Sequence, residues 1–274
     1  MKYDEIGYWS EVKLEIVRKY ATAYSTIMQA WPVIRQHIYI DAFAGAGKHV
    51  AKRTGQFVPG SPSNALLVDP PFSQYHFIDL NGSRVEELRQ IAGSRKDVRI
   101  HEGDCNEILL KDVFPSCRYE DFHRALCLLD PYKINVNWDV LLAAGSLRSI
   151  EVFYNFMIMD ANMNVFWRNP DKVTTTQATR MDCAWGDHSW REIAYKKKPG
   201  LFGDIEEKAS NKTIVEAFRR RLRDVAGFKY VPEPMPMRNS RGAVVYYLFF
   251  ASQNKNGQRI VSEIFDLYRS KGVC

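Results

Sequence analysis

The stretch that decides the fold is YIDAFAGAGKHV, residues 39–50. It begins with an apolar run typical of a buried strand and continues into an acid, Asp41, and two glycines, Gly45 and Gly47. Glycines at such a place let the backbone adopt positive φ angles and approach a ligand closely. A buried strand with this ending is typical of a ligand site at the carboxyl edge of a parallel sheet. A tight strand-to-helix turn without a ligand is the alternative.

Three kinds of glycine-rich ligand loop compete for this stretch, and two of them lack defining residues. A nucleoside-triphosphate P-loop needs a glycine five places before its Gly-Lys pair and a Ser or Thr directly after it. Around Gly47–Lys48, the chain has Ala42 and His49 at these places. A dinucleotide-binding G-x-G-x-x-G turn needs a third glycine where the chain has Val50. The kind that remains is the S-adenosylmethionine (SAM) loop of methyltransferases.

Composition describes an ordinary globular chain of 274 residues with 46% hydrophobic and 26% charged residues. We expect no membrane span, because no run approaches 18 apolar residues. The first 13 residues have no apolar signal core, so we expect a cytoplasmic protein. The five scattered cysteines favour neither a zinc site nor a disulfide framework, and we expect no metal. A net charge of +6 permits an anionic partner such as nucleic acid.

Strand patterns alternate with helix patterns through about residue 160. Strands are predicted at 34–43, 74–81, 98–104, 124–132, 150–160 and 243–254, and the main helices at 9–30, 83–93, 138–147, 212–228 and 260–270. Residues 48–62 are rich in Gly, Pro and basic residues and are predicted to be a loop. This alternation predicts an α/β protein with a mostly parallel central sheet and helices on both faces.

Four predicted strands end in an acid: Asp41, Asp79, Asp104 and Asp130. Because ligands bind at the carboxyl ends of parallel strands, we expect these acids to converge on one cleft. In a SAM site, Asp41 would face the methionine end, Asp79 the ribose hydroxyls and Asp104 the adenine amine. The alternative is that each acid only caps the helix that follows it.

The most specific motif is LLDPY, residues 128–132, at the end of the fourth strand. It resembles the Asp/Asn-Pro-Pro-Tyr/Phe motif of class I SAM-dependent methyltransferases that act on exocyclic amines of bases, although this chain has one proline. The resemblance implies that Asp130 and the Pro131 carbonyl accept hydrogen bonds from the amine and that Tyr132 stacks on the base. The similar DPPF at 69–72 precedes the second strand and is interpreted as a turn.

Several further stretches together resemble the three-Cys-motif partner (TcmP) family. They are WSEVKLEIVRKY, YIDAFAGAG, GSPSNAL, YHFIDLN, LLDPY and WGDHSW, which extend from about Trp9 to past Trp190. The resemblance implies a Rossmann-like class I SAM-methyltransferase fold with SAM as cofactor. It also implies a partner protein that carries the cysteine motif. The cofactor-binding residues are then expected to be Asp41, Phe43, Gly45, Gly47, Asp79, Asp104 and Cys105.

Residues 161–210 interrupt the alternating pattern and are rich in aromatic and basic residues. We interpret residues 1–274 as a single methyltransferase-like domain with 161–210 as a lid that recognises the substrate. Bases stack on aromatic rings and phosphates need cations. The expected substrate-binding residues are Trp167, Arg168, Trp185, Trp190 and Arg191. The alternative is a small helical lid whose tryptophans pack on the main domain.

The expectation for function is a SAM-dependent methyltransferase that acts on an amino group of a nucleobase. The substrate would be RNA, or DNA that is single-stranded or flipped, because a base inside a duplex cannot reach such a cleft. The alternative, from another class, is a non-catalytic SAM-fold module that binds nucleic acid or a three-Cys-motif partner protein.

Overall fold

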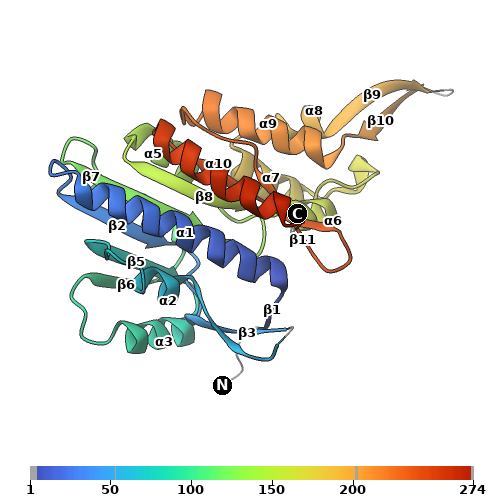
Figure 1. The fold of residues 1–274 in the computed structure, drawn as a ribbon. Coiled ribbons are helices and arrows are strands. Elements are labelled where there is room, and N and C mark those ends of the chain that lie inside the picture. The colour runs from blue at the N-terminus through green and yellow to red at the C-terminus, as the bar shows by residue number, and fades with distance from the viewer. Residues whose placement is uncertain (1–4, 53, 201–202, 273–274) are drawn as a thin grey trace.

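The computed structural model describes residues 5–52, 54–200 and 203–272 (Figure 1). At its centre is a seven-stranded sheet. The strand order is β6 (Val98–Glu102), β5 (Gln74–Asp79), β2 (Gln36–Asp41), β7 (His123–Leu129), β8 (Ile150–Phe156), β12 (Val244–Ala251) and β11 (Met235–Arg238). The strands from β6 to β8 are parallel, β12 is antiparallel to β8, and β11 is antiparallel to β12. The predicted Rossmann-like α/β fold, with a mostly parallel central sheet, is confirmed.

The order of the strands reverses between β2 and β7. From β2 the chain moves outward to β5 and β6, then returns to form β7 on the other side of β2 and continues to β8. In an open parallel sheet, such a switch point leaves a crevice at the carboxyl ends of the strands, where ligands bind. The loop that follows β2 and the DPY motif that follows β7 both lie at this point.

Two layers of helices cover the sheet. One face carries α1 (Tyr8–Ala30), α2 (Ser61–Leu66), α3 (Gly82–Ala92) and α10 (Lys255–Ser270), of which α1 and α10 pack side by side (Figure 1). The other carries α4 (Cys105–Ile108), α5 (Trp138–Leu147), α6 (Ile158–Asn164), α7 (Thr175–Trp185), α8 (Trp190–Ala194) and α9 (Asn211–Asp224). Every residue of β8 is buried, as expected for an apolar strand covered on both faces.

The predicted loop at 48–62 contains two short strands, which corrects that expectation. β3 (Lys48–Ala51) and β4 (Phe57–Pro59) form an antiparallel pair, and β1 (Glu5–Ile6) adds to β3 in parallel. This small sheet joins the segment before α1 to the segment after the glycine loop. Because β1 leads directly into α1, the sheet fixes the beginning of that helix near the carboxyl edge of the main sheet.

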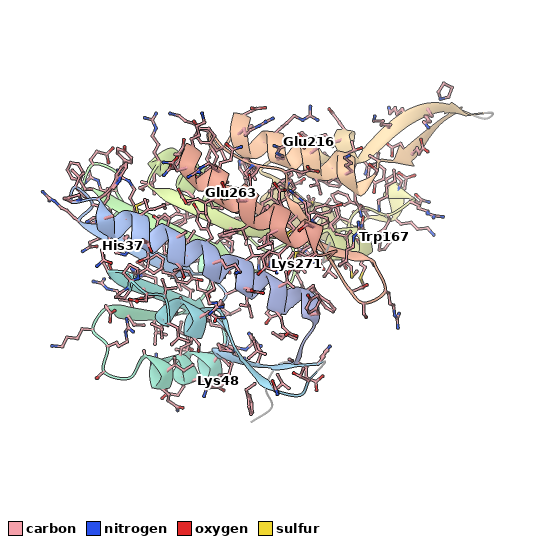
Figure 2. The ribbon with its side chains drawn as sticks, viewed as in Figure 1. His37, Lys48, Trp167, Glu216, Glu263 and Lys271 are labelled. Atoms are coloured by element: carbon pink, nitrogen blue, oxygen red, sulfur yellow. The ribbon has the colours of Figure 1, made fainter. Side chains whose placement is uncertain are left out.

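Most of the predicted lid at 161–210 packs against the face of the sheet that α5 and α9 cover. The short helices η1 (Leu109–Val113) and η2 (Phe114–Ser116) belong to the same layer, and η3 (Pro170–Lys172) precedes α7. The hairpin of β9 (Tyr195–Gly200) and β10 (Gly203–Lys208) projects from the body at the upper right of Figure 1. Leu201 and Phe202 lie outside the described residues. In Figure 2, Trp167 lies at the right of the molecule and Lys48 at the bottom.

A buried carboxyl group joins the helices of one face to the sheet. Glu151 on β8 accepts hydrogen bonds from the hydroxyl of Tyr20 on α1 and from Oγ of Ser252 after β12, the latter at 2.9 Å. Burial raises the pKa of Glu151 from 4.5 to about 7, although both hydroxyls act to lower it. The folded protein therefore favours the protonated form of this group over a pH range in which the unfolded chain ionises it.

Stability is expected to fall as the pH rises from about 4.5 to about 7, the interval between the unfolded and folded pKa values of Glu151. One pKa unit corresponds to about 1.4 kcal/mol, so the loss is on the order of 3 kcal/mol. Urea unfolding at pH 5 and pH 8 should show a smaller loss in Glu151→Gln than in the wild type. The control is Glu263→Gln, on the exposed side of α10 (Figure 2), which should match the wild type. An unchanged pH dependence in Glu151→Gln would contradict this assignment.

Candidate functional site

Two adjoining cavities lie at the carboxyl edge of the sheet. The first has a volume of about 520 Å³ and the second about 450 Å³, within the range of about 300–1,000 Å³ that is typical of ligand pockets. They share Phe43, Arg84 and Tyr132, which therefore stand at the boundary between them. The first cavity contains Asp130, and the second contains Asp79 and Asp104.

The second cavity is lined by the acids that follow β5 and β6. Asp79 is almost fully buried, and its carboxylate accepts hydrogen bonds from the backbone N–H of Gly45 at 2.9 Å and of Asn81 at 2.8 Å. Arg84 lies 3.9 Å from the same carboxylate. Asp79 thus fixes the glycine loop from the neighbouring strand while it lines the cavity. A preorganised carboxylate of this kind suits a pair of ligand hydroxyls.

Asp104 combines the two roles that the sequence left open. Its Oδ1 accepts hydrogen bonds from the backbone N–H of Asn106 at 2.8 Å and of Glu107 at 3.4 Å, so it caps α4. It also lines the second cavity, next to Cys105. The Cys105 side chain is buried, and burial raises the pKa of its thiol to about 12. Cys105 therefore contributes an uncharged, weakly polar wall.

The two glycines of the loop have different surroundings. Gly45 has a φ of 65° and lines the first cavity, with no heavy atom within 4 Å of the place that a Cβ would take. Gly47 has a φ of 71°, and a Cβ there would lie 2.4 Å from Cδ1 of Ile91. The carbonyl of Gly47 accepts hydrogen bonds from the N–H of Gly60 and the hydroxyl of Ser63. Gly47 lines neither cavity and instead joins the loop to α2.

Asp41 lies beneath the cavities and lines neither of them. It is fully buried, and its Oδ1 accepts a hydrogen bond from the N–H of Phe43 at 3.2 Å. Burial raises the pKa of Asp41 to about 7, the Ser61 hydroxyl acts to lower it, and the nearby carboxylate of Asp130 raises it further. The structure therefore places Asp41 behind the glycine loop, where it shapes the turn.

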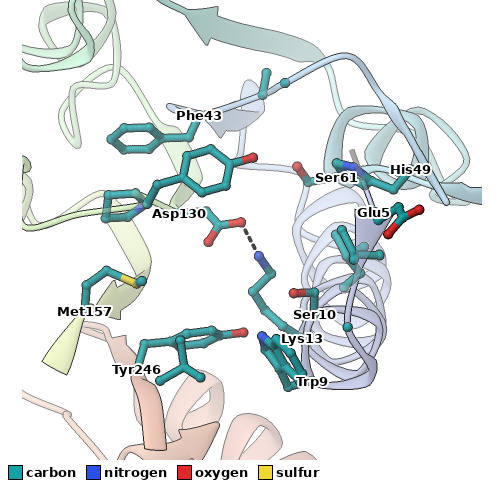
Figure 3. A pocket seen from close by; sticks show the side chains of 18 of the residues that line it. Glu5, Trp9, Ser10, Lys13, Phe43, His49, Ser61, Asp130, Met157 and Tyr246 are labelled. Carbon is teal, nitrogen blue, oxygen red and sulfur yellow. Dashed lines mark hydrogen bonds and ion pairs between the residues drawn. The ribbon is translucent and has the colours of Figure 1, made fainter. Parts of the chain in front are cut away.

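Asp130 is held on both carboxylate oxygens. Its Oδ2 forms an ion pair with Nζ of Lys13, and its Oδ1 accepts a hydrogen bond from the side-chain amide of Asn155. Figure 3 shows Lys13 extending from α1 toward Asp130. The Lys13 side chain is 8% exposed, so its ammonium group meets the carboxylate largely out of water. This arrangement fixes the orientation of Asp130.

Pro131 and Tyr132 complete the DPY motif at the mouth of the first cavity. The Tyr132 side chain is 65% exposed, and the guanidinium group of Arg84 lies 6.0 Å from its ring centroid. The ring stands where the two cavities meet. An exposed aromatic ring beside a partly buried carboxylate offers a stacking surface next to a hydrogen-bond acceptor.

The sequence prediction missed the wall that α1 and β12 contribute. Trp9, Ser10 and Lys13 of α1 and Tyr246 of β12 line the first cavity (Figure 3). One signal was available, because Lys13 falls on the apolar stripe of α1 that includes Ile16. A lysine on the buried face of a helix needs a partner of opposite charge, and Asp130 is that partner.

None of the five residues expected to bind substrate lines either cavity. Trp185 and Trp190 are 0% and 1% exposed, and their indole N–H groups donate to Ser189 and Asp182. Neither ring therefore presents a face to a ligand, which corresponds to the alternative of tryptophans packed on the main domain. Arg191 pairs with Glu206, Trp167 donates to a backbone carbonyl, and Arg168 is exposed.

The described residues contain no group of three or more His, Cys, Asp and Glu side chains that could hold a metal ion. Within the same ranges, no helix combines the length and apolar character needed to cross a bilayer.

No family model matches the sequence, and no curated protein matches it. Among solved structures, protein LPL1258 from Legionella pneumophila str. Philadelphia 1, of family DUF519, is similar with a TM-score of 0.57 and 12% identity, over 97% of this chain and 94% of that one. An S-adenosylmethionine-dependent methyltransferase from Mesorhizobium loti has a TM-score of 0.39 and 12% identity, over 84% and 97%. The CurJ carbon methyltransferase has a TM-score of 0.41 and 11% identity, over 86% of this chain and 54% of that one.

These likenesses bear on the fold. The similarity to the Legionella protein shows that the two chains share a fold over nearly their whole length. The similarity to the two methyltransferases is weaker, with TM-scores below 0.5.

Proposed function

We propose that the chain is a SAM-dependent methyltransferase that acts on an amino group of a nucleobase in RNA or in single-stranded or flipped DNA. One observation carries the proposal. The Asp130-Pro131-Tyr132 motif lines a cavity that adjoins a second, acid-lined cavity at the switch point of the sheet. A methyl donor and a methyl acceptor need adjoining sites of this kind.

The second cavity has side chains suited to SAM. Asp79 would accept hydrogen bonds from the two ribose hydroxyls, and Asp104 from the adenine amine. Phe43 and Gly45 would contact the methionine end at the boundary with the first cavity. The cofactor supplies an electrophilic methyl group on a sulfonium ion.

The first cavity would position the acceptor amine. An exocyclic amine is a poor nucleophile because its lone pair is delocalised into the ring. Hydrogen bonds from the amine to the carboxylate of Asp130 and to the carbonyl of Pro131 would favour a pyramidal nitrogen. The carboxylate of Asp130 would also be placed to accept the proton that the amine nitrogen loses on methylation. Holding reactants in attack geometry supplies about 7–11 kcal/mol in favourable cases.

Lys13 and Tyr132 would support this arrangement in different ways. The Lys13 ammonium group holds the carboxylate of Asp130 in place before the substrate arrives. Tyr132 would stack on the base, and stacking of this kind contributes about 1–3 kcal/mol. A base must leave a duplex to be bound between such groups, so the substrate is single-stranded, looped or flipped.

The resemblance to the TcmP family adds a proposed partner. A protein that carries a three-cysteine motif would bind this chain and supply the cysteines that the chain does not gather. Three of its cysteines, Cys105, Cys117 and Cys127, are buried and dispersed, and Cys183 is exposed. Co-purification of the two proteins from one host is the direct test.

A second candidate function is a non-catalytic SAM-fold module. It is favoured by the fact that both carboxylate oxygens of Asp130 already have partners in the free protein. A module of this class would bind SAM tightly, transfer no methyl group to any nucleic acid, and keep its partner binding in Asp130→Ala.

Purified protein is expected to bind SAM, and to bind NAD and ATP at least about 100-fold more weakly, because the loop lacks the third glycine and the P-loop groups. Isothermal titration calorimetry with the three ligands measures this. Tritiated SAM with total RNA, denatured DNA and duplex DNA then tests transfer, which should be weakest on duplex DNA. Binding of NAD or ATP without SAM, or transfer to protein alone, would refute the proposed function.

A further inference from the structure

A tyrosine in the wall of the first cavity has a buried hydroxyl without a hydrogen-bond partner among the described residues. Tyr246, on the antiparallel strand β12, is 4% exposed and lines this cavity together with Asp130 and Lys13. Its hydroxyl has no hydrogen-bond partner among the described residues. Figure 3 shows the ring below Asp130, with the hydroxyl directed toward the side of the cavity that Trp9 and Lys13 form.

An unpaired buried hydroxyl destabilises the folded state, and a phenylalanine of the same shape would avoid that cost. Tyr246 differs from other buried tyrosines with an unpaired hydroxyl in its position in the wall of a cavity. Tyr24 on α1 is 3% exposed and also has an unpaired hydroxyl, but it lines neither cavity. The two tyrosines belong to the same apolar core, so they form a matched pair that differs in access to the site.

The Tyr246 hydroxyl is suited to donate a hydrogen bond. Burial raises its pKa well above the ordinary value, and the negative charge of Asp130 raises it further, so the phenol keeps its proton at neutral pH. Asp130 accepts hydrogen bonds at the same cavity. The first cavity therefore presents an acceptor and, apart from it, an uncharged donor.

We infer that Tyr246 is a substrate-binding residue whose hydroxyl donates to an unprotonated ring nitrogen beside the amine that Asp130 holds. The inference rests on the proposed function and deepens it by naming the residue that would recognise the ring beside the amine. The substrate would be an aminated heteroaromatic base such as adenine, cytosine or guanine, in which the amine lies next to such a nitrogen. An isolated amine, such as that of lysine, has no neighbouring ring nitrogen that could accept a hydrogen bond from this hydroxyl.

The first test compares Tyr246→Phe with Tyr24→Phe. We expect Tyr246→Phe to lower kcat/KM about tenfold to a hundredfold on short single-stranded oligonucleotides that contain one adenine or one cytosine. The Kd for SAM should stay unchanged and the Tm should stay the same or rise, because an unpaired hydroxyl has been removed. Tyr24→Phe should show the same change in Tm with wild-type kinetics. A drop in Tm with Tyr246→Phe, without a change in kcat/KM, would show that the hydroxyl serves the fold.

The second test removes the ring nitrogen from the base. Oligonucleotides with 1-deazaadenine, 7-deazaadenine or 3-deazacytosine replace a nitrogen near the amine by CH. On the analogue that lacks the nitrogen bound by Tyr246, kcat/KM of the wild type should fall by a similar factor. For Tyr246→Phe, kcat/KM should be little lower on this analogue than on the natural base. Full additivity of the two changes on all three analogues would overturn the inference, because groups that interact do not add.

Binding separates failure of the inference from failure of the proposed function. Fluorescence anisotropy of the labelled oligonucleotides, with SAM present, gives a Kd whether or not methyl transfer occurs. We expect a Kd about tenfold higher or more for Tyr246→Phe than for the wild type. An equal Kd, with unchanged kinetics where transfer is observed, overturns the role of Tyr246. Transfer to a lysine peptide but to no oligonucleotide overturns the proposed function and, with it, the inference.

Discussion

Replacing Asp130 by alanine is expected to lower kcat for methyl transfer about 10²–10³-fold, the usual effect of removing one positioned polar group from an active site. The Kd for SAM should stay within about threefold of the wild type, because Asp130 lines the first cavity and the acids suited to SAM line the second. The loss should appear in kcat, since Asp130 would hold the amine during transfer.

The ion pair between Asp130 and Lys13 means that Asp130→Ala should also lower stability. Asp130→Ala leaves Lys13 in a largely buried position without its counter-charge, and breaking one side of a buried ion pair costs about 3–5 kcal/mol of stability. The double variant Lys13→Met/Asp130→Ala removes both charges. It should recover much of the lost stability in urea unfolding and remain inactive.

Single-turnover kinetics with tritiated SAM, together with calorimetry, measure both quantities. Asp139→Ala, on an exposed residue of α5, is the matched acid control and should behave as the wild type. Full activity in a folded Asp130→Ala variant would show that the site has been assigned wrongly. Loss of SAM binding as large as the loss of activity would show that Asp130 belongs to the cofactor site.

Local sequence pattern was enough to predict six of the seven strands of the main sheet, and only β11 was missed. The helix expected at 9–30 is α1, Tyr8–Ala30, and the one expected at 83–93 is α3, Gly82–Ala92. The predicted strands at 74–81 and 150–160 contain β5 and β8. These elements are long or continuously apolar. The acids that follow the strands lie at the carboxyl edge of the sheet, where the strand ends meet. Asp79, Asp104 and Asp130 could therefore be brought to one edge before the structure was known.

The wall of the first cavity could not be predicted in the same way. The strands β1, β3 and β4 have 2, 4 and 3 residues, and they are partly exposed. Strands this short leave no periodic signal, and β1 pairs with a segment more than 40 residues away. The basic and aromatic composition of 161–210 drew the prediction of a lid to that segment instead. Composition does not say which rings are buried, and Trp185 and Trp190 proved to be core residues.

The placement of Asp41 and Gly47 shows a second limit. Both belong to the motif that decides the fold, and both were expected to contact the cofactor. Side chains alternate along a strand, so Asp41 points to the α1 face with Tyr39, beneath the loop. Gly47 packs against Ile91. A motif fixes the path of the backbone, but whether each of its residues reaches a ligand depends on packing from distant helices.

Substitution of Asp79 is the counterpart of the Asp130 experiment, because it should impair SAM binding and not the transfer step. Asp79→Ala is expected to weaken SAM binding at least about 100-fold, because hydrogen bonds to a charged group contribute about 1.5–3 kcal/mol each and the ribose offers two hydroxyls. The same carboxylate holds the N–H of Gly45, so its loss also releases the glycine loop. The substitution should therefore also lower the Tm.

Asp79→Asn separates the two effects, because asparagine keeps one acceptor oxygen for the loop but presents an amide to the second hydroxyl. We expect both its Tm and its Kd for SAM to lie between those of the wild type and Asp79→Ala, because its amide nitrogen cannot accept from the N–H of Asn81. Calorimetry with SAM and a thermal melt measure both, with exposed Asp112→Ala as the acid control. At saturating SAM, kcat of Asp79→Asn should approach that of the wild type, since Asp130 and Lys13 are untouched. If Asp79→Ala bound SAM with wild-type affinity, the second cavity would not be the cofactor site. The proposed methyl transfer depends on the pairing of the two cavities, so it would be contradicted as well.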